Sequence, residues 1–201
     1  FWVHFTMQSS GSMFILLWGY PFMIQGEGLP RPLASGLLAS FVFIGFIVGP
    51  ILSHLCIRWP AKRHLIVVGL YSLIATSWLL IFLTPGKNPL WQIILLVLAI
   101  GIGGPASMVA FDYSRVSIPK HRLGSSNGII NSGGFVATFI SMFAVGIALD
   151  AVHSSRILGD QPLYSLGGFK LAFPLELVVI SFGLFKFFQA RSQTKSIGKP
   201  N

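Results

Sequence analysis

The stretch GSSNGIINSGGFVATF, from Gly124 to Phe139, decides the class of fold. It carries four glycines and two asparagines, yet it opens a run that stays largely apolar as far as Leu149. In a soluble helix a glycine costs about 1 kcal/mol relative to alanine, and a buried asparagine costs more unless it finds a partner. Small and polar residues in a long apolar helix are typical of helices that pack closely in a membrane.

The composition of the whole chain points the same way. Of its 201 residues 53% are hydrophobic and only 9% are charged, against about 25% charged in an ordinary soluble domain. The surplus of apolar surface must therefore face a lipid bilayer. The net charge of +9 could indicate a nucleic-acid binder, but the basic residues form short clusters between apolar runs, so we expect no nucleic-acid partner. Cys56 is the single cysteine, which excludes an internal disulfide.

Six apolar segments are long enough to cross a bilayer, which takes roughly 20 helical residues. They are 2–25, 33–57, 65–83, 90–111, 124–149 and 169–188. The connections between them are turn-rich or basic, and the one at 150–168 is a longer polar loop. We predict an all-α membrane protein with six transmembrane helices in a single domain over 1–189, followed by a basic, disordered tail over 190–201.

The basic residues of the connections predict the orientation, because cytoplasmic loops carry the excess of lysine and arginine. On one side lie Arg58, Lys62, Arg63, Arg115, Lys120, Arg122, Arg191, Lys195 and Lys199. On the other side lie only Arg31, Lys87, Arg156 and Lys170. We therefore predict a multi-pass protein of the plasma membrane with both termini in the cytoplasm.

The character of the six segments repeats in threes. The first and fourth contain expected breaks, WGYP at Trp18–Pro21 and GIGGP at Gly101–Pro105, the second and fifth are rich in small residues, and the third and sixth are oily. Because the first segment runs outward and the fourth inward, the two triplets form inverted repeats. Interrupted helices at matching positions of an inverted repeat indicate the binding site of a transporter.

Two local motifs add a resemblance to this pattern. GPILSHLCIRWPAKR (Gly49–Arg63) and RLGSSNGIINSGGF (Arg122–Phe135) resemble the C-terminal half, helices seven to twelve, of a major facilitator superfamily transporter. The resemblance implies secondary active transport of a small solute by alternating access, together with a missing N-terminal six-helix half. Ser53 stands where the family signature usually has an acidic residue, and Cys56 where it usually has glycine, which puts an acid-dependent charge relay in doubt.

A second class of function stays open, namely a non-transporting accessory subunit or the remnant of an interrupted transporter gene. The start at Phe1, without a methionine, suggests a fragment of a longer chain, and a reading frame for six further helices directly upstream would favour the transporter. We expect no enzyme, cofactor or metal site, because no nucleophile elbow or phosphate loop is present. The neighbouring His54 and Cys56 lack the second ligand pair of a zinc site.

The first span holds the clearest polar stripe. His4, Gln8 and Ser12 are spaced i, i+4 and i+8 and share one helix face. By the resemblance this helix lines the central cavity, which favours a substrate path at Gln8 and Ser12. Tyr20 could be a gate on that path or part of an interfacial aromatic belt. Asn131 could line the path or hold the bundle through an interhelical hydrogen bond.

Few charged residues fall within the spans. Proton coupling could use His4, although a solvated histidine near the cytoplasmic end is the commoner case, or Glu176, because intramembrane carboxylates are often functional. The resemblance places the twelfth helix, and so Glu176, at the periphery. Asp112 could clamp the basic loop at Arg58 and Arg63 as a cytoplasmic gate, or be a plain solvated helix end.

Small residues of the fifth span complete the expected site. Gly128, Ser132, Gly133 and Gly134 are expected to let this helix approach a neighbour closely, and the resemblance makes that neighbour the opposite half. No arginine lies at mid-membrane depth, which disfavours an anionic substrate unless the missing half supplies the charge. The substrate itself is not specified by the sequence.

Overall fold

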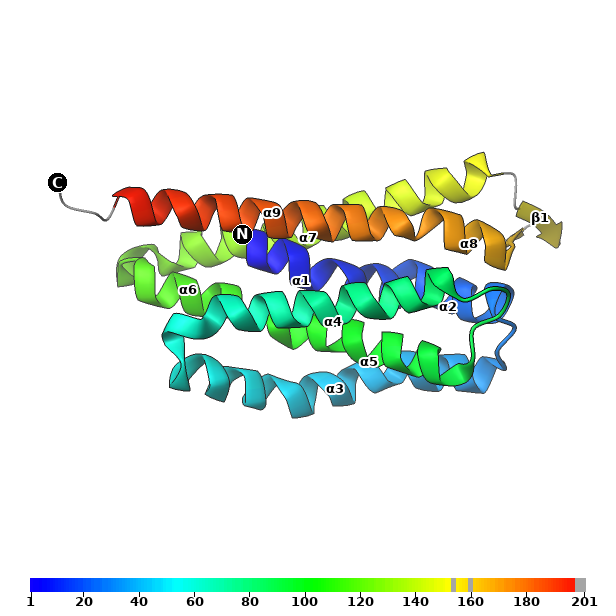
Figure 1. Ribbon diagram of the computed structural model, residues 1–201, viewed down its shortest axis with the longest axis horizontal. Coiled ribbons are helices and arrows are strands. Elements are labelled where there is room, and N and C mark those ends of the chain that lie inside the picture. The colour runs from blue at the N-terminus through cyan, green and yellow to red at the C-terminus, as the bar shows by residue number, and fades with distance from the viewer. Residues whose placement is uncertain (153–154, 159–160, 198–201) are drawn as a thin grey trace.

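The computed structural model describes residues 1–152, 155–158 and 161–197 of the chain. Long helices run side by side along one axis, with a small strand pair at one end (Figure 1). The elements are α1 (Trp2–Met13), α2 (Gly19–Pro21), α3 (Arg31–Arg58), α4 (Arg63–Leu83), α5 (Leu90–Ser107), α6 (Val109–Ser117), α7 (Leu123–Ala151), β1 (Ser155–Leu158), β2 (Gln161–Tyr164), α8 (Leu166–Ala172) and α9 (Pro174–Ile197).

Among the described residues, five helical stretches are long and apolar enough to cross a membrane. They are Arg31–Arg58, Pro60–Leu83, Leu90–Ser117, Lys120–Ala151 and Leu166–Gln193. The expected first span, 2–25, is also helical, but it alternates between α-helical and π-helical turns as far as Gly26. The expected fold class, a helical membrane protein, is confirmed, with one short strand pair added to it.

The expected break at Trp18–Pro21 does not interrupt the first helix. Proline lacks the N–H that would bond the carbonyl four residues back, and its ring crowds that carbonyl. The chain absorbs the proline with two wider π-helical turns, Phe14–Trp18 and Phe22–Gly26, on either side of α2. Such π-bulges bend a helix without ending it.

The break expected at Gly101–Pro105 is displaced along the chain. α5 continues through Pro105 to Ser107, and the interruption falls at Met108, whose N–H donates to the carbonyl of Pro105 at 3.1 Å in a tightened turn. α6 then continues to Ser117, so the first half of the basic stretch that we expected to be a loop is helical.

The expected polar loop at 150–168 also contains regular structure. β1 and β2 pair in antiparallel fashion, with Ser155 opposite Tyr164. Ser165 caps α8 by accepting a hydrogen bond from the Gly168 N–H at 3.1 Å. The chain therefore enters its last helix earlier than its hydropathy indicated.

The prediction of a disordered tail is wrong as far as Ile197, where α9 ends. The segment from Gln189 to Ile197 contains no glycine or proline and is rich in good helix formers, so the helix started in the apolar span simply continues. The last part of the predicted tail, 198–201, lies outside the described residues.

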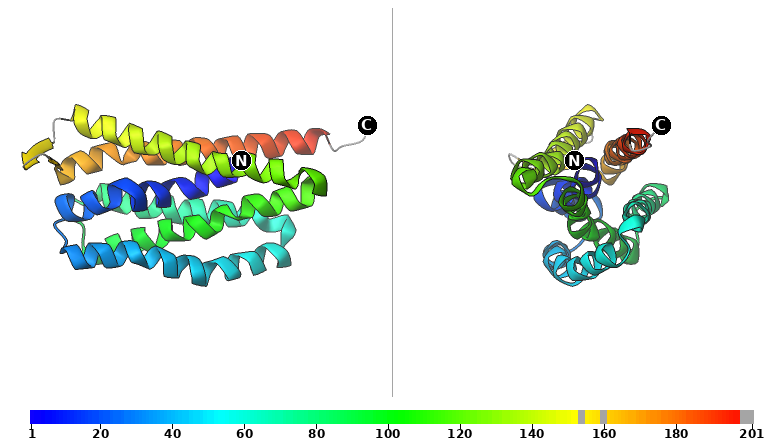
Figure 2. Two further views of the ribbon diagram at one scale, coloured as in Figure 1. Left: turned by 180° about the vertical axis from the view of Figure 1, so that it is seen from behind. Right: turned by 90° about the vertical axis from the view of Figure 1, so that its left-hand side faces the viewer.

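The packing of the helices is that of two inverted repeats. α1 packs against α7 and α9, α5 packs against α3 and α4, and α1 and α5 touch each other. The pattern is symmetric: if α1, α3 and α4 are exchanged with α5, α7 and α9 in that order, the same set of contacts results. Viewed along the bundle, α1 and α5 lie in the middle, between α7 and α9 on one side and α3 and α4 on the other (Figure 2). The polar stripe of α1 therefore lies on one of the two middle helices of the bundle.

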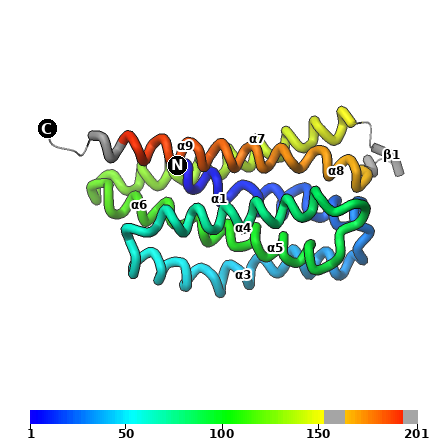
Figure 3. Tube along the Cα trace, in the orientation of Figure 1, coloured from blue at the N-terminus to red at the C-terminus, as the bar shows by residue number. Residues whose placement is uncertain are grey.

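The connections gather at two opposite ends of the bundle (Figure 3). One end, which we call the basic end, holds the turns at Pro60–Lys62 and Lys120–Arg122 and the C-terminal end of α9. The other, the hairpin end, holds the α4–α5 connection and the strand pair (Figure 1). The alternation on which the orientation prediction depends is present, and the side of the membrane on which each end lies stays a prediction.

Aromatic side chains fill the bundle towards the hairpin end. Phe14, Phe22, Trp78, Phe169 and Phe173 are all fully buried. Trp78 and Phe173 meet edge to face at 5.2 Å between ring centroids, a favourable aromatic geometry. Several large apolar side chains of α3, among them Phe43, Phe46 and Ile47, are exposed, as contact with lipid requires.

Candidate functional site

A small cavity of about 50 Å³ lies between α1 and α7, along the polar stripe. It is lined by His4, Gln8, Ser12, Leu16, Asn131, Phe135 and Thr138. Three of the four residues expected on the substrate path, Gln8, Ser12 and Asn131, thus meet in one place although the last is far from the others in sequence. Helical spacing on α1 could find the first two, whereas only the packing of α7 brings in Asn131.

A second cavity, of about 130 Å³, lies on the other side of the stripe, where α1 faces α3 and α5. Gln8 and Ser12 line this cavity too, together with small residues that include Gly11, Gly101 and Gly104. The two polar side chains therefore stand on a ridge between two cavities. A solute resting on that ridge could meet hydroxyl and amide groups together with apolar surface.

Gln8 is the centre of a short hydrogen-bonded chain. Its Nε2 donates to Ser12 Oγ at 2.8 Å, and its Oε1 accepts from Ser107 Oγ, on α5, at 3.2 Å. Ser107 also donates to the Gly104 carbonyl at 2.6 Å, so its one hydrogen serves two acceptors. The Gln8 amide carries a second hydrogen and the Ser12 hydroxyl keeps its own. The site can thus donate hydrogen bonds to a ligand without losing its own bonds.

Tyr20 does not join this group. Its side chain is 39% exposed, and it lines neither cavity. The neighbouring Trp18 is buried and donates from its indole nitrogen to the Met142 carbonyl at 3.0 Å, which fixes α1 to α7. A role of Tyr20 as a gate stays a prediction.

His4 lies in a different environment from the solvated one that its position near the cytoplasmic end suggested. It is buried, its Nδ1 lies 3.3 Å from the carbonyl oxygen of Ser107, and its ring meets the Phe111 ring edge to face at 5.4 Å. Facing a carbonyl, Nδ1 must carry a hydrogen to make that bond. The N-terminal turn of α1 is thereby attached to the end of α5.

Two glycines of α7 allow the close approach of α1. A Cβ at Gly133 would lie 2.9 Å from the Phe1 carbonyl oxygen, and one at Gly134 would lie 2.7 Å from His4 Cδ2. The resemblance made the opposite half the neighbour of this helix, whereas Gly133 and Gly134 pack on α1 of this chain. Gly128 faces open space, and Ser132 is exposed and bonds only its own helix, at the Ile129 carbonyl. An approach of the opposite half to these two residues stays a prediction. They lie on the side of α7 that is turned away from α1.

A buried carboxyl group joins α1 to α9. Glu176 is fully buried, and its Oε1 accepts from Ser9 Oγ at 2.9 Å and from Ser10 Oγ at 2.7 Å. Ser9 Oγ also lies 3.0 Å from Ser141 Oγ of α7. The resemblance places its helix at the periphery, and α9 does lie on the outside of the bundle, but the Glu176 side chain is buried on the side of α9 that packs on α1. The sequence analysis did not identify Ser9, Ser10 and Ser141 as partners of this group. Their only signal in the sequence is that Ser9 and Ser10 directly follow Gln8.

The expected cytoplasmic clamp is not formed in this structure. Asp112 pairs with Arg115, one turn away on α6, at 3.4 Å, because the helical extension to Ser117 puts the two side chains on one face. Arg58 instead lies 5.6 Å over the Trp59 ring, and Arg63 6.0 Å over the ring of Tyr113.

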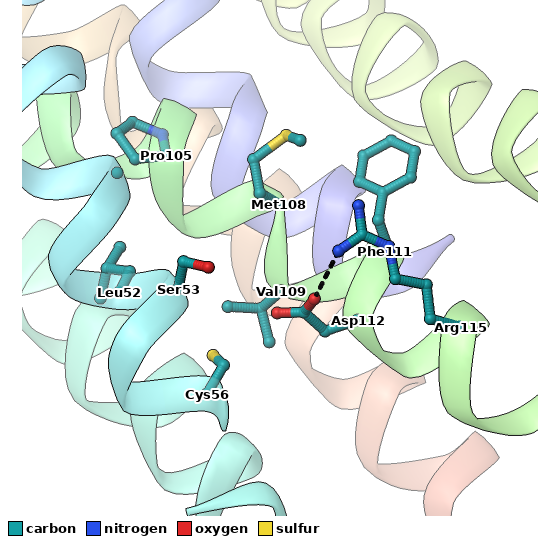
Figure 4. Close-up of a pocket in the computed structure, with 10 residues that line it drawn as sticks. Leu52, Ser53, Cys56, Pro105, Met108, Val109, Phe111, Asp112 and Arg115 are labelled. Atoms are coloured by element: carbon teal, nitrogen blue, oxygen red, sulfur yellow. Dashed lines mark hydrogen bonds and ion pairs between the residues drawn. The ribbon is translucent and has the colours of Figure 1, made fainter. Parts of the chain in front are cut away.

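The signature region surrounds a cavity of about 250 Å³ between α3 and the α5–α6 junction (Figure 4). Ser53 and Cys56, the two departures from the family signature, face this cavity from α3, and Asp112 borders it from α6. In the part of the chain that the structure describes, no group of three His, Cys, Asp or Glu side chains could hold a metal ion.

Comparison with known proteins agrees with this architecture. The chain is 32% identical over 145 residues to a "Tetracycline resistance determinant" of Streptomyces rimosus, an alignment that covers 67% of this chain and 41% of the relative. The chain thus spans well under two thirds of that relative's length. No solved structure matches it significantly. The sequence profile of the Major Facilitator Superfamily matches residues 1–142, and the chain belongs to that superfamily.

Proposed function

We propose that this chain is the C-terminal half of a secondary active transporter that moves a small solute across the plasma membrane by alternating access. The observation that carries the proposal is the ridge of Gln8 and Ser12 on α1, with a cavity on each side and Asn131 across one of them. An apolar cavity with a few convergent polar groups is the usual form of a small-molecule site. The central position of α1, which belongs to the first repeat and packs against all three helices of the second, supports it further.

The missing partner in this proposal is an N-terminal six-helix half. Two small-residue faces are left uncovered, one on α3 at Gly45 and Gly49, the other on α7 at Gly124 and Gly128, where an added Cβ would meet nothing within 4 Å. Small residues on a transmembrane helix let another backbone approach closely. We propose that the N-terminal half packs on these two faces during the transport cycle.

The topology in this proposal has six spans and both termini in the cytoplasm. The connections at the basic end carry Arg58, Lys62, Arg63, Lys120 and Arg122. Loops rich in lysine and arginine stay in the cytoplasm, so the basic end is assigned to that side. The hairpin end then faces outward.

The solute is proposed to be an uncharged or zwitterionic organic compound. The ridge offers amide and hydroxyl groups, and no arginine lies at mid-membrane depth to bind an anion. The name of the Streptomyces rimosus relative connects that protein with tetracycline resistance. We take tetracycline as the first solute to test on the full transporter that contains this chain.

The test is solute exchange in proteoliposomes that contain the full-length transporter. Radiolabelled tetracycline outside should exchange with unlabelled tetracycline inside, and the exchange should saturate. The same vesicles should be tested with Gln8→Ala and with Met13→Ala, since Met13 is buried on the far side of α1. Saturable exchange that both variants retain unchanged would contradict the proposed site.

A further inference from the structure

Glu176 differs from the other buried carboxyl group of the described chain in how its oxygens are bonded. Glu27 is almost fully buried, and both its oxygens accept hydrogen bonds from Asn88, Oε2 from the backbone N–H at 2.8 Å and Oε1 from Nδ2 at 2.6 Å. Glu176 receives two serine hydroxyls on Oε1, whereas its Oε2 is buried with no hydrogen-bond partner among the described residues. A satisfied carboxylate holds structure, whereas a half-satisfied one calls for another explanation.

Among the residues that the structure describes, no positively charged group bonds to Glu176. On α1 the titratable group is His4, whose Nδ1 faces the Ser107 carbonyl, and on α8 it is Lys170, whose Nζ donates to the carbonyls of Thr84 and Gly86 at 2.5 and 2.6 Å. Both groups are therefore engaged elsewhere.

The groups on the remaining neighbours make contacts elsewhere or lie at an end of the bundle. On α4, Tyr71 bonds the Ser181 hydroxyl at 2.6 Å and Arg63 lies over the ring of Tyr113; His64 sits beside Arg63 in the first turn, at the basic end. On α7 the charged group is Asp150, at the hairpin end, which accepts from the Tyr164 hydroxyl. The hydrogen bonds that Glu176 accepts come from serines only.

This geometry suits the neutral acid. An ionised carboxylate without a counter-charge is very costly to bury, whereas a protonated one removes the charge and leaves one hydroxyl to be satisfied. Intramembrane carboxylates of this kind mark proton relays in transporters. Hydrogen bonds also connect Glu176 with the candidate solute site. Ser9 and Ser10, which bond to Glu176, directly follow Gln8 on α1, and Ser9 is hydrogen-bonded in turn to Ser141 of α7.

We infer that Glu176 is a site where the transporter binds and releases a proton, and that Ser9 and Ser10 transmit its charge state to the α1–α7 cavity. The step is the making and breaking of one O–H bond at Oε2. When the site is hydrated the carboxylate takes the proton from hydronium and leaves a water molecule, and on release the proton returns to a water molecule as hydronium, so that no other bond changes. The ionised state requires water or a shift of α1, because the dry site offers Oε2 no donor among the described residues. The inference rests on the proposed transport function for its role, although the protonation itself can be tested without a solute.

The first test is infrared spectroscopy of the full-length transporter in lipid vesicles over a pH series. A protonated, buried carboxyl should give a C=O band that disappears as the pH rises. The band should be absent in Glu176→Gln and retained in Glu27→Gln, the matched control at the other buried carboxyl. If no titrating band differs between the wild type and Glu176→Gln, the inference is overturned.

A second variant guards against a Glu176→Gln protein that fails to insert. Ser10→Ala removes the shorter of the two hydrogen bonds to Oε1, so the same band should move to higher frequency and still titrate. A band that neither moves in Ser10→Ala nor titrates would overturn the assignment to Glu176. A purely structural Glu176 would lower the melting temperature in both variants without giving any titrating band.

Transport measurements connect the proton site with the solute and separate the two claims. A pH gradient should drive accumulation of labelled tetracycline in wild-type and Glu27→Gln vesicles, and Glu176→Gln should lose that accumulation. Accumulation that persists in Glu176→Gln overturns the coupling role of this residue while leaving transport intact. A wild type that exchanges no tetracycline, even without a gradient, counts against the solute and transport proposal, and the infrared titration then still decides whether Glu176 binds a proton.

Discussion

The side-chain amide of Gln8 donates from Nε2 to the hydroxyl of Ser12, 2.8 Å away and one turn further along α1. The same amide accepts from Ser107 of α5 at 3.2 Å. One side chain thus connects the two central helices of the inverted repeats and stands between two cavities. The polar stripe is held in place before any solute arrives, which is the property that a specific binding site requires.

Replacing Gln8 by alanine should weaken solute binding to the full transporter by about ten- to hundredfold, because a hydrogen bond to a buried amide is worth about 1–3 kcal/mol when one partner is deleted. Titration calorimetry or a thermal-shift ligand series would measure the loss. Met13→Ala is the control, since Met13 is fully buried on the opposite face and should lower stability more than affinity. An unchanged affinity in Gln8→Ala with a lower melting temperature would make Gln8 a packing residue.

Gly134→Ala should destabilise the packing of α1 on α7. The added methyl would lie 2.7 Å from His4 Cδ2 and 2.9 Å from Gln8 Cγ, and overpacking of this kind typically costs about 1–3 kcal/mol. The melting temperature in detergent should fall. Gly128→Ala is the matched control on the same helix, where the methyl meets open space. In the chain by itself the control should melt at the wild-type temperature or slightly above, and equal losses in both variants would argue against the close approach.

Asn88→Ala should loosen the hairpin end. It removes the 2.6 Å bond from Nδ2 to Glu27 Oε1 and leaves that buried oxygen without its donor, at a cost of about 1–3 kcal/mol. Thermal unfolding monitored by tryptophan fluorescence would detect the change. Lys87→Ala, at the exposed neighbouring position, should have little effect. Identical melting curves for both variants would show that the Glu27–Asn88 contact contributes nothing to stability.

Labelling of single cysteines should reveal the orientation. With Cys56 replaced by serine, a cysteine at Lys87 should react with a membrane-impermeant maleimide in intact cells, and one at Lys62 only after the membrane is permeabilised. Both positions are exposed and lie at opposite ends of the bundle. The reverse labelling pattern would invert the topology, and labelling of both positions in intact cells would contradict the arrangement of spans.

Apolar runs predicted the long helices well, because in a bilayer every backbone polar group must be satisfied within its own segment. α3, for example, runs over Arg31–Arg58 where the apolar run was 33–57. The polar residues of α6 and of the end of α9 were read as loop or tail, because hydropathy does not detect a helix that continues beyond the apolar run. Proline marked the place where helix geometry changes, but not whether the result is a π-bulge or a displaced break.

The candidate site was predictable only where it depends on helical spacing. Gln8 and Ser12 share a helix face because they are four residues apart, and in the structure their side chains are hydrogen-bonded to each other. The burial of Glu176 depends on Ser9 and Ser10 at the other end of the chain, and no local pattern carries that information. The pairing of Asp112 with Arg115 depended on an unforeseen helical turn.

The uncovered glycines of α3 and α7 lead to the last prediction. Gly45 and Gly128 each face open space within this chain, although glycine weakens a helix relative to alanine. Such a cost is expected where a second backbone must approach closely. Gly69 on α4 also faces open space, but it lies on one of the oily helices, whose neighbour in the proposed transporter is lipid.

The chain and the missing N-terminal half, co-expressed as separate polypeptides, should therefore associate through the faces that contain Gly45 and Gly128. Gly45→Leu and Gly128→Leu should each abolish co-purification of the two halves, because a leucine side chain holds the helices apart, while Gly69→Leu should leave it intact. The amount of each variant in the membrane must match that of the wild type, so that lost association is not lost insertion. Solute exchange should follow co-purification, with neither half active when it is expressed without the other. Robust exchange by this chain as a purified monomer, or association unaffected by leucine at both positions, would refute the assignment of these faces to the partner half.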